Sequence, residues 1–309
     1  LGPAGRLWLR GMEAWWTMES GEAESLVSDE RARIGYLFGE RGALMMANGG
    51  GMWQISSEPP GDRRPLHVAA QVFEHTMSSH ADPEGRLWLG DRQGLFVREG
   101  ATWSERRTSD GASIREVRDI EDHPSGGLLL ASAGRGLLWH DAAGALARLD
   151  RDSGVLSDNI RHIRLDSERL WLSTEDAGLC TVPLAEVATR PWRCVDEGAG
   201  LPAPGAHVSV PDGLGRVWAS TNYGIAVARV EELDAFARGE LDEVGFLVLD
   251  RRHGMASSEA NGGYDQAFAR DDDGVLWFPT QRGAAGIRPV DFDFPAAPSV
   301  RIDRLLVGN

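Results

Sequence analysis

The chain has 309 residues, of which 42% are hydrophobic and 38 are Gly, and its formal net charge is −15. The hydrophobic share is sufficient for a core. A chain that binds phosphates would be expected to carry a basic excess, so the charge argues against nucleic acid or an anionic membrane surface as a partner. No apolar run approaches about 18 residues, and the first residues do not form a signal peptide, so the sequence predicts no membrane span here.

A short motif, Gly-x-(Leu/Val)-Trp, recurs along the chain. Clear copies occupy 5–9, 85–89, 215–219 and 274–278, the copy at 169–172 lacks the first Gly, and 42–46 and 127–130 are degenerate. The Trp-equivalent positions are 8, 45, 88, 130, 171, 218 and 277, which are 37, 43, 42, 41, 47 and 59 residues apart. Repeats of this length with strand and turn patterns are typical of propeller blades, because one unit cannot bury its own faces.

The order of strands can be predicted within a unit. From residue 159 to 182, an apolar alternation, a turn, a strand around Trp171, a Gly turn and a last apolar run follow one another. We therefore expect an all-β, seven-bladed β-propeller of four-stranded antiparallel blades over residues 1–290. The first unit lacks its innermost strand, which we expect the parent chain to supply. Five units carry a Gly six residues after the Trp position, where we expect a hairpin turn with positive φ: Gly51, Gly94, Gly136, Gly224 and Gly283.

Cys180 and Cys194 fall on the predicted third and fourth strands of one blade. Antiparallel neighbours could place them face to face, and a bridge would then indicate an oxidising compartment. Two small buried thiols fit the sequence equally well. Their spacing matches no zinc or redox motif.

The last third of the chain carries the most specific pattern. A helical insertion is expected at 234–243 and a strand at 246–249, followed by Arg252–Met255, Ser258–Gly263, Asp273–Thr280 and a proline-bounded linker at 294–298. This order resembles the end of the two-component regulator propeller, the extracytoplasmic sensor of hybrid histidine kinases and of some diguanylate cyclases. Residues 154–163 likewise resemble the way that blades of this family begin. The resemblance implies that 291–309 is a linker and the first strand of an immunoglobulin-like triple-tyrosine domain.

The resemblance further implies a periplasmic sensor that is anchored by a following transmembrane helix and is a homodimer in the full receptor. Its ligand would be an oligosaccharide or another small molecule, and a cytoplasmic kinase or cyclase would receive the signal. The sequence contains no phosphoacceptor motif, no nucleotide loop and no Gly-Gly-Asp-Glu-Phe stretch. We therefore expect this chain to catalyse nothing and to need no cofactor.

Ligand-binding candidates come from loops on one face of a propeller, since loops on a rigid scaffold collect binding residues. The loops between the second and third strands contribute Asp91, Arg92, Gln93, Arg135, Glu175, Asp176, Asn222, Tyr223, Gln281 and Arg282. The loops that lead into the innermost strands contribute Asp158, Asn159, His207, Glu259 and Asn261. Amides, carboxylates and Arg forks suit sugar hydroxyls, and Tyr223 is the best candidate for stacking. Each of these could instead be a solvated turn residue.

Two other classes of function stay open. A propeller lyase of the virginiamycin-inactivating type, or a hydrolase with a metal-assisted site, would need a His, an acidic residue and a divalent cation on one face. His207 or His253 with Glu259 is the available set. A protein-binding scaffold is the other alternative. No HExxH motif occurs, and Asp271–Gly274 lacks the ligand spacing of an EF-hand, so we expect no metal site.

Overall fold

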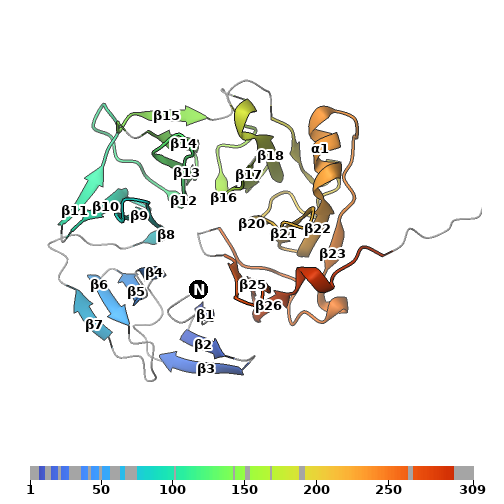
Figure 1. Cartoon of the computed structure of the whole chain (residues 1–309), viewed down its shortest axis with the longest axis horizontal. Helices are drawn as coiled ribbons and strands as arrows, with labels where there is room; N and C mark the ends of the chain where they lie inside the picture. The colour runs from blue at the N-terminus through green and yellow to red at the C-terminus, as the bar shows by residue number, and fades with distance from the viewer. Residues whose placement is uncertain are drawn as a thin grey trace, which may run out of the picture.

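A computed structural model describes residues 75–295, except 101, 142, 150–153, 168, 188–191 and 264–266, and the backbone of seven strands before residue 75. The strands form sheets that surround a common axis like the blades of a propeller (Figure 1). Strands β4, β8, β12, β16 and β20 lie nearest the axis in that view. The expected all-β propeller is thus confirmed.

The sheets follow the chain in order. The first contains β1 (Leu7–Arg10), β2 (Trp15–Glu19) and β3 (Glu22–Val27), and the second contains β4 (Tyr36–Glu40), β5 (Ala43–Asn48), β6 (Gly51–Ile55) and β7 (Arg63–Leu66). The third contains β8 (Thr76–Ala81), β9 (Leu87–Asp91), β10 (Leu95–Glu99) and β11 (Thr102–Arg106), and the fourth contains β12 (Val117–Asp122), β13 (Leu128–Ser132), β14 (Gly136–His140) and β15 (Leu146–Leu149).

The remaining sheets carry the short helices. The fifth contains β16 (Ile160–Leu165), β17 (Arg169–Thr174), β18 (Leu179–Pro183) and β19 (Cys194–Val195), and the sixth contains β20 (Val208–Pro211), β21 (Arg216–Thr221), β22 (Gly224–Arg229) and β23 (Leu247–Leu249). The last contains β24 (Ala269–Arg270), β25 (Leu276–Thr280) and β26 (Gly283–Ile287). Helix α1 (Val230–Arg238) and the 3-10 turns η4 (Leu184–Glu186), η5 (Glu197–Ala199), η6 (Arg251–His253) and η7 (Pro289–Asp291) complete the described elements.

The prediction of seven four-stranded blades is wrong. The described chain forms five four-stranded sheets, and the β1–β3 and β24–β26 sheets have three strands each. After β26 the chain turns at Pro289, whose ring removes a backbone donor, into η7. Phe292 and Phe294 then pack on the hydrophobic cluster between the β20–β23 and β24–β26 sheets instead of pairing with β26. This packing uses the residues that a fourth strand would need.

The recurrent Trp is held by an aspartate from the preceding turn. The indole Nε1 donates to Asp82 from Trp88 at 2.7 Å, to Asp166 from Trp171 at 2.8 Å, to Asp212 from Trp218 at 3.0 Å and to Asp271 from Trp277 at 2.7 Å. The aspartates also accept backbone N–H groups of their own turns. The repeat therefore encodes one unit, in which a carboxylate closes the turn and fixes the ring against the next sheet.

The degenerate fourth unit lacks both the Trp and the Asp of the repeat, and other residues form the contact at its turn. His123 occupies the turn and Leu130 replaces the Trp. The ring of Trp139 on β14 stacks on His123 with centroids 4.5 Å apart, and its Nε1 donates to the Gly126 carbonyl at 3.4 Å. An aromatic contact at the turn is thus kept, although it comes from the next strand.

Glycine is required at the hairpin turns of the fifth and sixth sheets. Gly178 has φ 73° and Gly224 has φ 146°, and a Cβ would lie 2.0 Å from the Val195 carbonyl oxygen or 2.4 Å from that of Leu249. The expectation of positive φ is wrong for Gly94, which is absent from the left-handed residues. Gly51 lies outside the residues whose backbone angles are described.

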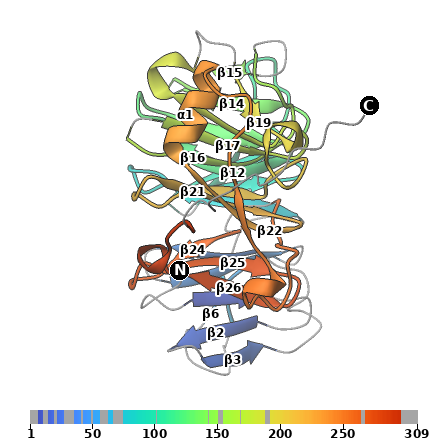
Figure 2. The same cartoon turned by 90° about the vertical axis from the view of Figure 1, so that its right-hand side faces the viewer.

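The expected helical insertion is α1, which begins four residues earlier than predicted, at Val230. Leu233 and Phe236 are buried and anchor it to the fifth and sixth sheets. It ends at Gly239, which adopts φ 79°. Figure 2 shows α1 along the side of the ring. In the described part of the chain, no helix is long and apolar enough to cross a membrane.

Cys180 and Cys194 form a disulfide between β18 and β19, where they are direct cross-strand partners. Both residues are buried among the side chains that fill the space between the fourth and fifth sheets. The bridge joins the outermost strand of this sheet, which has only two residues, to its neighbour. It therefore compensates for a short strand.

A buried histidine makes the stability of the ring depend on pH. His162 is only 4% exposed, and its burial, with a smaller contribution from Arg164, lowers its pKa to about 3. The nearest carboxylate oxygen, on Asp119, lies 3.8 Å from Nε2 and already accepts the Ile163 N–H at 2.7 Å. The imidazole is therefore neutral in the folded state, whereas in the unfolded chain it protonates near pH 6.5.

Because the unfolded chain binds the extra proton, stability is full above about pH 6.5 and falls as the pH is lowered toward 3. We expect His162 to reduce the free energy of unfolding by roughly 2 kcal/mol between pH 7.5 and pH 5. Urea denaturation at both pH values would measure the change. H162F should flatten the dependence, and H253Q, at an exposed position, should not. An equal dependence in H162F and wild type would contradict this explanation.

Candidate functional site

The predicted ligand loops meet on one face of the ring, called face A, which carries the β9–β10, β13–β14, β17–β18, β21–β22 and β25–β26 loops. Backbone hydrogen bonds join each of these loops to the segment that leads into an innermost strand. The pairs are Glu116 N to Arg92 O, Ala133 N to Glu116 O, Glu175 N to Asn159 O, Ala206 N to Thr174 O, Ala260 N to Thr221 O and Gln281 N to Glu259 O. The two sets of loops are thus one continuous, rigid surface.

At the centre of face A, two arginines share one carboxylate. Arg118 and Arg161 lie at the register irregularities of β12 and β16, so both leave the ladder at the same point of neighbouring innermost strands. Arg118 Nη1 donates to Glu175 Oε2 at 2.9 Å, and Arg161 Nη2 lies 3.7 Å from Glu175 Oε1. The bond from Arg118 is the main reason why the pKa of Glu175 is below its usual range. Glu175 is 44% exposed, so the shared carboxylate is open to solvent.

His207 extends this group of residues onto the sixth sheet. Its Nδ1 lies 2.8 Å from Arg161 Nη1 and its Nε2 lies 2.9 Å from Asn222 Oδ1. A guanidinium only donates, so Nδ1 accepts and Nε2 carries the proton. Burial and then the charge of Arg161 lower the pKa of His207, which favours this neutral form. We call Arg118, Arg161, Glu175, His207 and Asn222 the Arg–His cluster.

The cluster leaves donor groups unused. The Nε atoms of Arg118 and Arg161 are buried and have no acceptor among the described residues. Burial lowers the pKa of Arg161, although it stays far above neutrality as an arginine. The cluster itself thus contains two guanidinium groups and one carboxylate, in a chain with a net charge of −15, and the charge of Glu259 also acts on His207.

The candidates of the third and fourth sheets serve mainly the turns. Asp91 is buried and accepts the backbone N–H groups of His75 and Gln93 at 3.0 and 2.9 Å. Arg92 is exposed, 3.4 Å from Glu116. Arg135 donates to the Ser113 carbonyl at 3.2 Å. These residues border the Arg–His cluster without joining it.

The Asp158 and Asn159 candidates also hold loops in place. Asn159 accepts the Gly134 N–H at 3.0 Å through Oδ1, and Asp158 lies 3.6 Å from Arg148. Asp176 accepts a hydrogen bond from the Ser157 hydroxyl. All three side chains thus take part in contacts between neighbouring loops of face A.

The last sheet contributes an exposed rim. Gln281 donates to Glu259 Oε1 at 3.3 Å, and Tyr223 is 59% exposed. Asn261 and Arg282 are exposed, and their backbone N–H groups donate to the Pro279 carbonyl and the Thr280 hydroxyl. Gly262 packs so closely on His207 that a Cβ would lie 2.2 Å from the His207 Cβ. The 259–262 segment therefore covers one side of the Arg–His cluster.

Sequence reasoning missed Arg118 and Arg161, because both lie on innermost strands and not on loops. A signal was present. Each arginine follows the first buried apolar residue of its strand, in Val117-Arg118-Asp119-Ile120 and Ile160-Arg161-His162-Ile163. In a regular strand, successive side chains alternate between the two neighbouring sheets. The β-bulge that turns the two arginines toward face A instead is not visible in the sequence.

The residues proposed for a metal-assisted site do not form one. His207 is committed to Arg161 and Asn222. His253 lies in η6, where its Nδ1 is 3.1 Å from Asp250. Among the described residues, no group of three or more His, Cys, Asp or Glu side chains is arranged to hold a metal ion.

No protein-family model and no curated relative matches the chain by sequence. Solved structures do match. The extracellular domain of the hybrid two component system BT3049 from B. thetaiotaomicron superposes with a TM-score of 0.73 at 19% identity, over 93% of this chain and 38% of that one. This chain has the fold of that extracellular domain. The corresponding domain of BT4673 matches with a TM-score of 0.56 at 16% identity, over 94% of this chain and 47% of that one.

These extracellular domains are longer than this chain, which spans less than half of the length of either. Virginiamycin B lyase from Staphylococcus aureus shares the fold too, with a TM-score of 0.63 at 10% identity over 93% of this chain and 92% of the lyase. Extracellular domains of two component systems and a lyase therefore share this fold, so a function has to be argued from the residues of face A.

Proposed function

We propose that the chain is the ligand-binding part of an extracytoplasmic signalling receptor, and that face A binds a saccharide at the Arg–His cluster. The observation that supports this best is the cluster itself. Three neighbouring sheets contribute polar side chains that converge near the axis of the ring, where two guanidinium groups flank the exposed carboxylate of Glu175. Such a set binds hydroxyl and carboxylate groups and lacks the metal ligands of a hydrolytic centre.

The surrounding residues fit the shape of a saccharide. Tyr223 exposes its ring beside Asn222, and Gln281 and Glu259 form a hydrogen-bonded rim. Aromatic faces pack on the apolar side of a sugar ring, whereas amides and carboxylates bind its hydroxyl groups. The location outside the cytoplasm is supported by the disulfide, because such bonds persist in oxidising compartments.

In this proposal the ligand is a neutral or acidic saccharide, and the signal reaches a kinase or cyclase beyond the chain as a shift between two arrangements of the ring and the domain after it. Dimerisation of the receptor belongs to the same proposal. The match to extracellular domains of hybrid two component systems supports this direction of signalling.

A thermal-shift screen against neutral and acidic oligosaccharides tests the proposal, since a ligand that binds only the folded state raises the melting temperature. We expect a saccharide-specific rise in the wild type. R161Q should weaken binding by on the order of tenfold, because a hydrogen bond from a charged group is lost. R251Q, an exposed arginine in η6, is the matched control.

A separate arm with divalent cations alone distinguishes the enzymatic alternative. A rise in melting temperature with cations and none with any saccharide would favour a metal-assisted lyase or hydrolase. A rise that persists undiminished in R161Q would place the site elsewhere on the molecule.

A further inference from the structure

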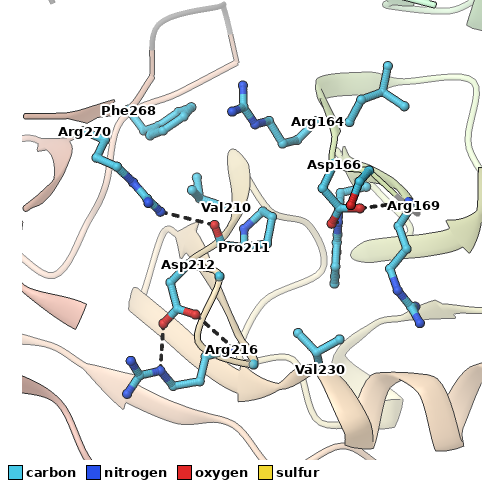
Figure 3. A pocket seen from close by; sticks show the side chains of 15 residues that line it. Arg164, Asp166, Arg169, Val210, Pro211, Asp212, Arg216, Val230, Phe268 and Arg270 are labelled. Atoms are coloured by element: carbon cyan, nitrogen blue, oxygen red, sulfur yellow. Dashed lines mark hydrogen bonds and ion pairs between the residues drawn. The ribbon is translucent and has the colours of Figure 1, made fainter. Parts of the chain in front are cut away.

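A cavity opens on the opposite face of the ring, called face B, which carries the loops between the first and second strands of each sheet. It has a volume of about 630 Å³ and lies between the fifth and sixth sheets, with β24 on its third side (Figure 3). The ends of β16 and β20 provide Arg164 and Pro211, and β24 with the residues before it provides Phe268 and Arg270. Small-molecule sites usually have volumes of this order.

The carboxylates in the wall of the cavity are already used. Asp212 accepts from Trp218 Nε1, from Arg216 Nε at 2.7 Å and from the Leu214 N–H at 2.7 Å. Asp166 accepts from Trp171 Nε1 and from the Arg169 N–H, each at 2.8 Å. Neither aspartate is free to bind a cation or a row of hydroxyl groups.

The arginines at the cavity mouth are less constrained. Arg270 is exposed and donates to the Pro211 carbonyl at 3.3 Å, and no carboxylate of the described residues pairs with it. Arg164 is 44% exposed and forms a single 3.3 Å ion pair with Glu121. Both side chains line the cavity, and Figure 3 shows Arg164 beside the ring of Phe268. The available charge is therefore positive, which favours an anion.

The cavity also has an apolar wall. Phe268 is half-buried and its ring meets the edge of His162, with centroids 5.8 Å apart and planes at 86°. Val210, Pro211 and Val230 continue this surface. The apolar face of a sugar ring can pack on Phe268 while a carboxylate on that ring reaches the arginines.

The wall of the cavity is connected to the end of the described chain. Arg216, which lines the cavity, donates from Nη2 to the Pro289 carbonyl at 2.7 Å and from Nη1 to the Phe292 carbonyl. Phe292 in turn packs edge-on against Trp218 with centroids 4.9 Å apart. We call residues 289–294 the exit segment. The same guanidinium thus binds Asp212 in the wall and two carbonyls of the exit segment.

We propose that this cavity is a second ligand site, for a sugar ring that carries a carboxylate, and that its occupancy acts on the exit segment through Arg216. The inference goes beyond the proposed function, which places its saccharide at the Arg–His cluster on face A. An anion beside Arg164 and Arg270 changes the electrostatic potential at Arg216 and Asp212. The hydrogen bonds from Arg216 to the Pro289 and Phe292 carbonyls therefore change in strength. Ligand binding in the cavity thereby changes how firmly the exit segment is held against the sixth sheet.

The test uses D-glucuronate as the probe, with D-glucose as the uncharged ring, benzoate as the aromatic carboxylate, and sodium chloride to match ionic strength. We expect calorimetric titration of the chain to show binding of glucuronate, and of glucose on the order of tenfold more weakly. R270Q and R164Q, both at exposed positions, should each weaken glucuronate binding to a similar extent. Because the Arg–His cluster is also expected to bind acidic saccharides, every titration is repeated in R161Q. Glucuronate binding that remains in R161Q is assigned to the cavity, and adding R270Q or R164Q should weaken it, which separates this inference from the proposed function.

Hydrogen exchange gives the second readout. The amides of Asp291 and Phe292, which bond to Arg288 and Pro289 at 3.1 Å, should exchange more slowly or more rapidly when glucuronate is bound. An unchanged exchange rate in the exit segment at saturating glucuronate would overturn the coupling. Equal binding of glucose and glucuronate, binding of benzoate alone, or full binding by R270Q and R164Q would overturn the site.

Discussion

Replacing Asp212 by alanine should lower the free energy of unfolding by about 3–5 kcal/mol, the range observed when one partner of a buried ion pair is removed. The Asp212 side chain is fully buried and the Arg216 side chain is 11% exposed. In D212A, Arg216 would be buried without its carboxylate, Trp218 Nε1 would lose its acceptor, and two backbone N–H groups of the turn would be left unpaired. Urea denaturation monitored by tryptophan fluorescence measures the change.

The matched control is D272A. Asp272 is exposed in the equivalent turn of the last sheet, where Asp271 and not Asp272 accepts the hydrogen bond from Trp277. It should change the free energy of unfolding by less than roughly 0.5 kcal/mol. Similar stability of D212A and D272A would show that the Trp–Asp bond is incidental to the repeat. D212A should also release the exit segment, because Arg216 no longer has a fixed orientation.

Removing the disulfide should cost about 3 kcal/mol, the value for a closed loop of about 15 residues. Cys180 and Cys194 are 14 residues apart in sequence and buried. Their bond ties β19 to the sheet, and β19 has only two residues for backbone pairing. The double variant C180A/C194A avoids a free thiol, and its urea midpoint can be compared with that of the wild type.

The same comparison in the presence of a reductant provides the control. Reductant should lower the midpoint of the wild type and leave that of C180A/C194A unchanged. If the double variant is as stable as the oxidised wild type, the bridge does not hold the outer strand in place.

The propeller fold could be predicted because the residues that define each repeat lie close together in the sequence. The Trp, the glycine that opens its strand and the Asp that closes the turn before it occur within seven residues in Asp82–Trp88 and Asp212–Trp218. The number of strands in the last sheet could not be predicted in this way. It depends on whether Phe292 and Phe294 pair with β26 or pack on the sixth sheet, and that is decided by tertiary packing around Trp218.

The site was predicted in part. The loops that hold Glu175, His207 and Asn222 were correctly assigned to one face, since propeller topology places them there. Arg118 and Arg161 were missed, because a β-bulge and not the alternation of the strand directs them. The cavity on face B was not predicted either. Its lining comes from residues more than 100 positions apart, such as Arg164 and Arg270, that only the packing of successive sheets around the axis brings together.

The central claim is that the Arg–His cluster binds a saccharide. The most direct measurement is a calorimetric titration of the wild type and of R118Q/R161Q with the oligosaccharide that raises the melting temperature most. For a neutral oligosaccharide, which lacks the carboxylate that the cavity on face B prefers, we predict one-site binding to the wild type and its loss in the double variant, with the folded state of both confirmed by their circular dichroism spectra. Equal affinity for the two proteins would contradict the claim.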